Sequence, residues 1–239
     1  MKLSKRLETV ASMVTKGNRA ADVGCDHGFV PIFLVESGIS PLAVAADVRP
    51  GPLSRAKEHI KEHRLEEKIQ TRLSDGLANI KPGEADSLIM SGIGGILMMR
   101  LLQDEEHTAK SFKELILSPQ SELFDVRRYL VSNGYLIEYE HMLCDEGKYY
   151  FIFHVLVKKD EREWSEEEYR YGKDICKDDM KTFLAYLEKE ERQYEQILEK
   201  MKQAPENDRA VQRIAQLHQD ITCLKKRRQL VYDCGCCFD

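Results

Sequence analysis

Short apolar runs alternate with amphipathic stretches through the first two-thirds of the chain. The runs have the length of buried strands, at 20–24, 41–47, 69–73, 86–90 and 114–117. Between them, apolar residues recur every three to four positions, which is typical of one face of a helix. This spacing predicts helices over 29–36, 52–64, 96–102 and 121–132. Strands that alternate with helices along a chain predict a parallel sheet and an α/β fold of the Rossmann type.

The pattern changes before and after these units. Residues 135–144 and 149–158 are rich in aromatic and β-branched side chains, and the polar residues 145–148 join them as in a β-hairpin. We therefore expect a mostly parallel sheet with an antiparallel edge strand. A leading helix is predicted before the first strand, with Leu3, Leu7 and Val10 on its apolar face and Lys5 and Arg6 on its basic side.

The last third of the chain has a different composition. Residues 165–232 contain one glycine and one proline, and their apolar residues form stripes over 180–201 and 214–231. A break at 204–208 predicts two antiparallel helices, a helical hairpin or short coiled coil. We place the domain boundary between 160 and 161, giving domains 1–160 and 161–239.

The second of these helices carries four consecutive cations, Lys225, Lys226, Arg227 and Arg228, and the first is rich in glutamate. Two interpretations stay open. The opposite charges could pair across the helices, or the cations could form a basic face that binds RNA phosphates. For the second interpretation we also expect Arg6, Arg19 or both near the binding cleft.

Composition limits the classes of protein. The 239 residues are 42% hydrophobic, enough for one good-sized domain with an appendage, and the net charge of −5 argues against a uniformly basic nucleic-acid binder. With no signal peptide and no apolar run of membrane-spanning length, we expect a soluble, cytoplasmic protein without a membrane partner. The seven cysteines suggest reduced thiols. Cys234, Cys236 and Cys237 lack the spacing of a zinc site, so no metal is expected.

A glycine turn follows the first strand, in Ala-Ala-Asp-Val-Gly-Cys-Asp-His-Gly over 20–28. The dinucleotide motif Gly-x-Gly-x-x-Gly would need glycine where Asp26 and Phe29 stand. The Asp26 carboxylate disfavours a pyrophosphate and favours a cationic ligand with an amino group, such as S-adenosylmethionine. A plain turn without a ligand is the alternative.

Acidic residues stand at the ends of three successive predicted strands, at Asp26, Asp47 and Asp75. An open α/β sheet binds its ligand at the carboxyl ends of its strands, where Asp47 could accept ribose hydroxyls and Asp75 an adenine amino group. After the fourth strand, Gly92, Gly94 and Gly95 leave room for a planar base and a methyl donor against the same backbone. A flexible loop is the alternative.

Several motifs together resemble the bacterial tRNA (adenine-N1)-methyltransferases that modify adenine 22. They are Leu-Ser-Lys-Arg-Leu at 3–7, Ala-Asp-Val-Gly-Cys-Asp-His at 21–27, Ser-Asp-Gly-Leu at 74–77, Ser-Gly-Ile-Gly-Gly at 91–95 and Leu-Ile-Leu-Ser-Pro-Gln at 115–120. The resemblance covers nearly the whole chain, except the cysteine-rich end. It implies a class I methyltransferase domain that uses S-adenosylmethionine, and a C-terminal coiled coil that helps to hold tRNA.

These expectations assign residues to roles. The cofactor cleft is expected to contain Gly24, Cys25, Asp26, Asp47, Asp75, Gly76, Ser91 and Gly92. The N1 lone pair needs no strong base, so catalysis would rest on alignment and on a carboxylate near the developing positive charge. Asp26 is the candidate, with His27 and Arg6 positioning the base or its phosphate. Substrate contacts are expected from Arg6, Gly94, Gly95 and the four cations at 225–228. Rival functions are a small-molecule methyltransferase and a non-catalytic tRNA- or protein-binding module.

Overall fold

A computed structural model describes residues 1–175, 179–202 and 208–233. The cysteine-rich end, including Cys234, Cys236 and Cys237, lies outside the described residues. The chain divides into two compact units, Met1–Arg162 and Glu163–Asp239. In the described part, no helix is long and apolar enough to cross a membrane.

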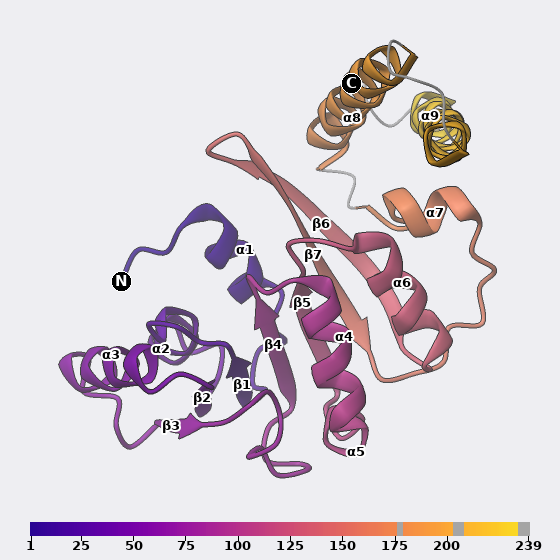
Figure 1. Ribbon diagram of the computed structural model, residues 1–239. Helices are drawn as coiled ribbons and strands as arrows, with labels where there is room; N and C mark the ends of the chain where they lie inside the picture. Colours follow the sequence, from indigo (N-terminus) through magenta and orange to yellow (C-terminus); the bar gives the residue numbers. More distant parts are fainter. Residues whose placement is uncertain (176–178, 203–207, 234–239) are drawn as a thin grey trace. The chain divides into compact units, whose positions relative to one another are not determined.

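The first unit is built on a seven-stranded sheet, in the order β3-β2-β1-β4-β5-β7-β6 (Figure 1). Its strands are β1 (Ala20–Val23), β2 (Ala43–Asp47), β3 (Ile69–Leu73), β4 (Ser87–Ser91), β5 (Glu114–Ser118), β6 (Leu136–Asp145) and β7 (Lys148–Leu156). Strands β1 to β5 are parallel, and β7 runs antiparallel to both β5 and β6. The expected α/β sheet is confirmed, with the antiparallel strand β7 one place inside the edge.

Helices lie on both faces of this sheet, as in a doubly wound fold (Figure 1). They are α1 (Lys5–Ser12), α2 (Phe29–Glu36), α3 (Pro50–Glu62), α4 (Gly95–Asp104), α5 (Glu106–Ala109) and α6 (Leu123–Ser132). The helices α1, α2 and α3 pack together on one face, and α4 packs against α6 on the other. Strands β2 and β5 are buried at every residue, which explains their continuous apolar runs.

A buried polar cluster fixes the amino end of the sheet. Glu114, at the start of β5, accepts hydrogen bonds from the Thr15 hydroxyl at 2.6 Å and the Ser87 hydroxyl at 2.5 Å, and its Oε2 lies 3.0 Å from His154 Nε2. Burial would raise the pKa of the Glu114 carboxyl, but these hydrogen bonds outweigh it and lower the pKa to about 2. The cluster thus joins the loop after α1 to β4, β5 and β7.

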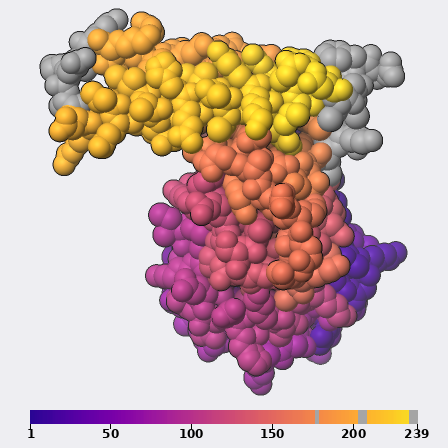
Figure 2. All heavy atoms as spheres, turned by 90° about the vertical axis from the view of Figure 1, so that its right-hand side faces the viewer, coloured from indigo at the N-terminus to yellow at the C-terminus, as the bar shows by residue number. Residues whose placement is uncertain are grey.

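The second unit consists of α7 (Glu166–Tyr171), α8 (Met180–Lys202) and α9 (Asp208–Asp233). Leu198 near the end of α8 packs against Leu217 and Ile221 of α9. Glu191, earlier in α8, instead pairs with Lys225 and Arg228, later in α9. The two helices are therefore antiparallel, as expected, and α9 is the yellow rod of side chains in Figure 2.

The sequence analysis missed α7. This six-residue helix begins with a capping box, in which the Ser165 hydroxyl accepts from the Glu168 backbone N–H and the Glu168 carboxylate accepts from the Ser165 N–H. Its Arg170 pairs with Asp220 of α9 at 2.9 Å. A helix this short has too few turns to show an apolar period.

Candidate active site

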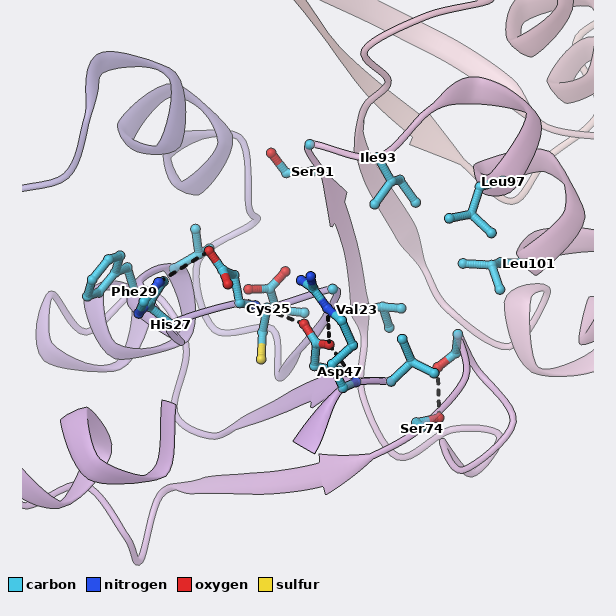
Figure 3. A pocket seen from close by; sticks show the side chains of 18 of the residues that line it. Val23, Cys25, His27, Phe29, Asp47, Ser74, Ser91, Ile93, Leu97 and Leu101 are labelled. Carbon is cyan, nitrogen blue, oxygen red and sulfur yellow. Dashed lines mark hydrogen bonds and ion pairs between the residues drawn. The ribbon is translucent and has the colours of Figure 1, made fainter. Parts of the chain in front are cut away.

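A cavity of about 590 Å³ opens at the carboxyl ends of the parallel strands. The loops that follow β1, β2, β3, β4 and β5 all contribute to its lining, together with Arg6 and Leu7 of α1. Figure 3 shows Ile93, Leu97 and Leu101 on one side of the cavity and His27 and Phe29 on the other. The acids at the strand ends meet here because parallel strands present their carboxyl ends at one edge.

In the turn after β1, three of the five residues 24–28 have positive φ. Gly24 has φ of 80°, Asp26 of 50° and Gly28 of 72°. Glycine adopts this conformation without strain, whereas at Asp26 it is sparsely populated and is often found at functional sites. A Cβ at Gly28 would lie 3.1 Å from the Ala56 Cβ, so glycine also lets α2 approach α3. The turn leaves the Asp26 side chain 59% exposed at the cavity.

Asp47 holds the neighbouring loops together. Its carboxylate is buried and accepts from the backbone N–H of Arg49 at 2.8 Å and from that of Asp26 at 3.3 Å. The expected ribose acceptor therefore lies in the cavity wall and also fixes the turn that carries Asp26. Asp75 and Gly76 close the wall after β3, where Asp75 is exposed and 3.9 Å from the Arg100 guanidinium.

The structure adds Asp22 of β1, which the sequence analysis did not assign to the site. This carboxyl lines the cavity but is only 4% exposed. Burial, followed by the nearby Asp47 carboxylate, raises the pKa of Asp22 to about 7, although Arg6 opposes the shift. A charged residue inside an otherwise apolar, buried strand was the signal that could have revealed it.

Cys25 also lines the cavity, as expected. Burial and the Asp22 and Asp47 carboxylates raise the pKa of its thiol. A protonated thiol is a poor nucleophile, so Cys25 shapes the cavity without supplying a reactive thiolate.

His27 belongs to a stack of three rings beside the cavity. Its ring centroid lies 5.3 Å from that of Phe29 and 5.8 Å from that of His59. Its Nε2 is 3.6 Å from an Asp26 carboxylate oxygen and 3.5 Å from the Arg55 guanidinium. The stack holds His27 next to Asp26, and the two residues expected to act together are adjacent in space.

Arg6 reaches the cavity from α1. Its Nη1 donates to the Ser91 hydroxyl at the end of β4 at 2.7 Å, and its guanidinium lies over the Tyr150 ring at 5.4 Å from the centroid. These contacts bring the leading helix to the strand ends. Arg6, Ser91 and Gly92, all expected at the site, thus line the cavity together.

Other predicted site residues lie elsewhere. Gly94 and Gly95 do not line the cavity; a Cβ at Gly95 would lie 2.5 Å from the Ser121 carbonyl oxygen, so this glycine permits close packing of α4 against the loop before α6. Of the two arginines of which one or both were expected near the cleft, Arg6 lines the cavity and Arg19 does not. It precedes β1, at the amino end of the strand, where its Nε donates to Asp86 at 2.8 Å.

The cations at 225–228 are engaged within the second unit. Lys225 and Arg228 pair with Glu191, and Lys226 pairs with Glu167. Arg227 is buried, donates to the Lys173 carbonyl at 3.0 Å and lies over the Phe183 ring. Charge pairing across α8 and α9, one of the two interpretations above, accounts for Lys225 and Arg228, and Lys226 pairs with α7 instead. Contact of the four cations with RNA stays a prediction.

The sheet order and the acidic cavity at its carboxyl edge define a class of protein, the Rossmann-like class I methyltransferases. A family described as a methyltransferase domain matches residues 3–153, and the chain belongs to this family.

Two relatives are similar over nearly the whole chain. The tRNA (adenine(22)-N(1))-methyltransferase of Bacillus subtilis is 28% identical over 95% of this chain and 97% of its own length. Its crystal structure aligns with a TM-score of 0.85 over 95% of this chain and 99% of that one. A Streptococcus pneumoniae protein in complex with S-adenosyl-L-methionine is 31% identical, with a TM-score of 0.83 over 95% of this chain and 100% of that one.

Proposed function

We propose that this protein transfers a methyl group from S-adenosylmethionine to N1 of adenine 22 in tRNA. The observation that carries the proposal is the cavity at the carboxyl edge of the sheet, where four carboxylates, those of Asp22, Asp26, Asp47 and Asp75, converge. A methyltransferase domain supplies the class of reaction, and similarity to the Bacillus subtilis enzyme over 95% of the chain supports the target base.

The cavity residues fit a cationic methyl donor. Two buried acids face it, and the proximity of Asp47 helps to raise the pKa of Asp22, so a positive ligand would relieve their repulsion. The donor would be held by Gly24, Cys25, Asp26, Asp47, Asp75, Gly76, Ser91 and Gly92. When bound, S-adenosylmethionine supplies an activated methyl group on its sulfonium.

The remaining chemistry consists of orientation and charge placement. Adenine N1 has a free lone pair at neutral pH, so no residue has to remove a proton before transfer. The product is a cation, and the exposed Asp26 carboxylate is the group we assign to stabilise it, with His27 holding Asp26 and the base in position. Arg6 is positively charged and so cannot stabilise the cationic product. We therefore assign it to contact with a phosphate of the tRNA or with the face of the base.

A tRNA substrate has further consequences. Adenine 22 must leave its stack to reach the cavity, at a cost of a few kcal/mol. We propose that the antiparallel helices α8 and α9 help to hold the tRNA while the first unit acts on the base. The substrate would place the enzyme in the cytoplasm.

Methyl transfer to two synthetic tRNAs tests the proposal. We expect labelled methyl groups from the donor to enter a tRNA with adenine at position 22 and not a matched tRNA with guanine there, and the labelled nucleoside to be 1-methyladenosine. The Asp26→Asn variant, which keeps the side chain's size and loses its charge, should be slower by about 10²-fold or more. Equal labelling of both RNAs, or labelling only of small acceptors, would contradict the proposed function.

A further inference from the structure

The loops after β4 and β5 are joined by their backbones at one end of the cavity. Gly92 N–H donates to the Ser118 carbonyl at 3.1 Å, and Gln120 N–H donates to the Ile93 carbonyl at 2.9 Å. These bonds hold the Gln120 backbone beside the Gly92–Ile93 peptide. The backbone from which the Gln120 side chain extends into the cavity is therefore fixed before a ligand binds, which lowers part of the ordering cost of recognition.

The side chains of Gln120 and Arg6 both line the cavity beside Gly92. From the point where a Gly92 Cβ would stand, Gln120 Nε2 is 3.7 Å away and Arg6 Nη1 is 3.4 Å away. Gly92 has φ of 86°, so a larger residue would be strained there, and its Cβ would touch both side chains. The absence of a side chain at Gly92 keeps the cavity open beside the amide and the guanidinium.

The Arg6 guanidinium and the Gln120 amide differ in whether they already have partners within the protein. Arg6 is already engaged by the Ser91 hydroxyl and the Tyr150 ring. The Gln120 side chain is exposed at the cavity, and within the described part of the chain its amide has no hydrogen-bond partner. It therefore offers one acceptor and an NH₂ donor on a fixed backbone.

A carboxamide of this kind matches one edge of adenine. Its oxygen accepts from the N6 amino group while its nitrogen donates to N7, whereas guanine presents two acceptors on the same edge. This pairing leaves the adjacent Watson–Crick edge of the base, which carries N1, open to the methyl donor. It also places no charge near N1 and removes no proton from it.

We infer that Gln120 is a specificity-determining residue that reads the N6/N7 edge of the target adenine. The inference rests on the proposed function, and it assigns a task to the last residue of the Ser-Pro-Gln motif. Because the contact is to N7, an RNA in which only N7 of the target base is changed isolates it.

The main test compares two RNAs and three forms of the protein, and a fourth form, Gln120→Glu, checks the donor separately. The RNAs carry either adenine or 7-deazaadenine at position 22; the second keeps N1 and the N6 amino group but has a C–H in place of N7. The proteins are the wild type, Gln120→Leu and a control, Gln103→Leu, which makes the same change at an exposed position on α4 outside the cavity. Comparing RNA ratios between proteins cancels any intrinsic difference in N1 reactivity.

The measured ratio is kcat/KM for the 7-deazaadenine RNA divided by kcat/KM for the adenine RNA. We expect this ratio to be about tenfold lower in the wild type and in Gln103→Leu than in Gln120→Leu, where the contact is already lost. Gln120→Glu, which keeps an acceptor and loses the donor, should behave like Gln120→Leu in this ratio. A structural role for Gln120 would slow both RNAs equally, and equal ratios in the wild type and Gln120→Leu would overturn the inference. A wild type that methylates neither RNA would overturn the proposed function, and the inference with it.

Discussion

At the scale of single residues, the cavity is unusual in bringing two buried carboxyls together. Asp22 and Asp47 are 4% and 3% exposed, and Asp47 is held by backbone N–H groups from both neighbouring loops. Asp22 instead has a pKa of about 7, raised by burial and by Asp47. When Asp22 is ionised, near and above neutral pH, it lowers the free energy of unfolding of the free protein. A bound cation would stabilise the ionised form, as expected for a carboxyl in a binding site.

Replacing Asp22 with asparagine should change how stability depends on pH. The carboxyl has its pKa raised from 3.8 to about 7, so the folded state holds a proton that the unfolded chain releases across this window. The free energy of unfolding contributed by Asp22 therefore falls as pH rises from about 4 to 7. Asp22→Asn should lack this fall and, at pH 8, unfold with a free energy about 3–5 kcal/mol above the wild type.

Denaturant unfolding at pH 5, 6, 7 and 8 measures this difference. Asp75→Asn is the matched control, because that carboxylate lines the same cavity but is 67% exposed. The control should follow the wild-type curve. If the free energy of unfolding depended on pH in the same way in the wild type and in Asp22→Asn, the raised pKa of Asp22 would be contradicted.

At the scale of elements, glycine positions decide how closely helices approach one another and the cavity. Gly28 lies against Ala56 of α3, and Gly95, at the start of α4, lies against the Ser121 carbonyl and Val126 of α6. The glycine-rich loop after β4 thus has two tasks. Gly92 leaves the cavity open beside Arg6 and Gln120, while Gly95 lets α4 and α6 pack.

Substitution of Gly95 by alanine should destabilise the first unit. The new Cβ would lie 2.5 Å from a backbone oxygen and 2.8 Å from the Val126 Cγ2, so the helices must separate, at a cost of about 1–3 kcal/mol in the free energy of unfolding. Gly51→Ala in α3 is the control, since a Cβ there meets nothing within 4 Å beyond its chain neighbours. Pro52 follows directly and disfavours a helical alanine, which offsets the entropy gain, so the control should change by less than about 1 kcal/mol. Thermal unfolding should therefore shift downward in Gly95→Ala and change little in Gly51→Ala. An unchanged unfolding temperature in Gly95→Ala would mean that α4 can shift to accommodate the added Cβ without loss of stability.

At the scale of the whole molecule, the net charge is −5, and Lys225, Lys226 and Arg228 of α9 form ion pairs with glutamates of the second unit. Glu191 alone engages Lys225 and Arg228. The first unit contains the complete sheet and the whole cavity. We therefore expect donor binding to belong to the first unit and RNA holding to require both.

A chain that ends at Arg162 should fold and bind the donor with unchanged affinity but methylate tRNA at least tenfold more slowly. The cut belongs after Arg162 because its guanidinium donates to the Ile137 carbonyl of β6 at 2.6 Å and to Asp160 at 2.8 Å. Calorimetry with the donor and a tRNA methylation assay on the same preparation separate the two properties. Full tRNA activity in the shortened protein would show that α8 and α9 do not hold the substrate.

The sequence by itself determined the alternation of the parallel strands with helices along the chain, the glycine turn, and the position of Asp26, Asp47 and Asp75 at one edge of the sheet. These follow from local periodicity and from the rule that parallel strands share a carboxyl edge. The same rule, applied to the direction of β1, already places Arg19 at the opposite edge. The resemblance added the class of reaction, which the methyltransferase domain over 3–153 confirms.

Only the tertiary structure decided which side chains meet across long separations in sequence. Arg6 reaches Ser91, 85 positions away, and Gln120 comes to lie beside Gly92 because two loops exchange backbone hydrogen bonds. The structure also shows that Asp22, which in the sequence is one acid in an apolar run, lines the cavity and that burial raises its pKa. Periodicity shows which face of an element is buried, but the partner on that face is set by the packing of distant elements, and no local pattern encodes it.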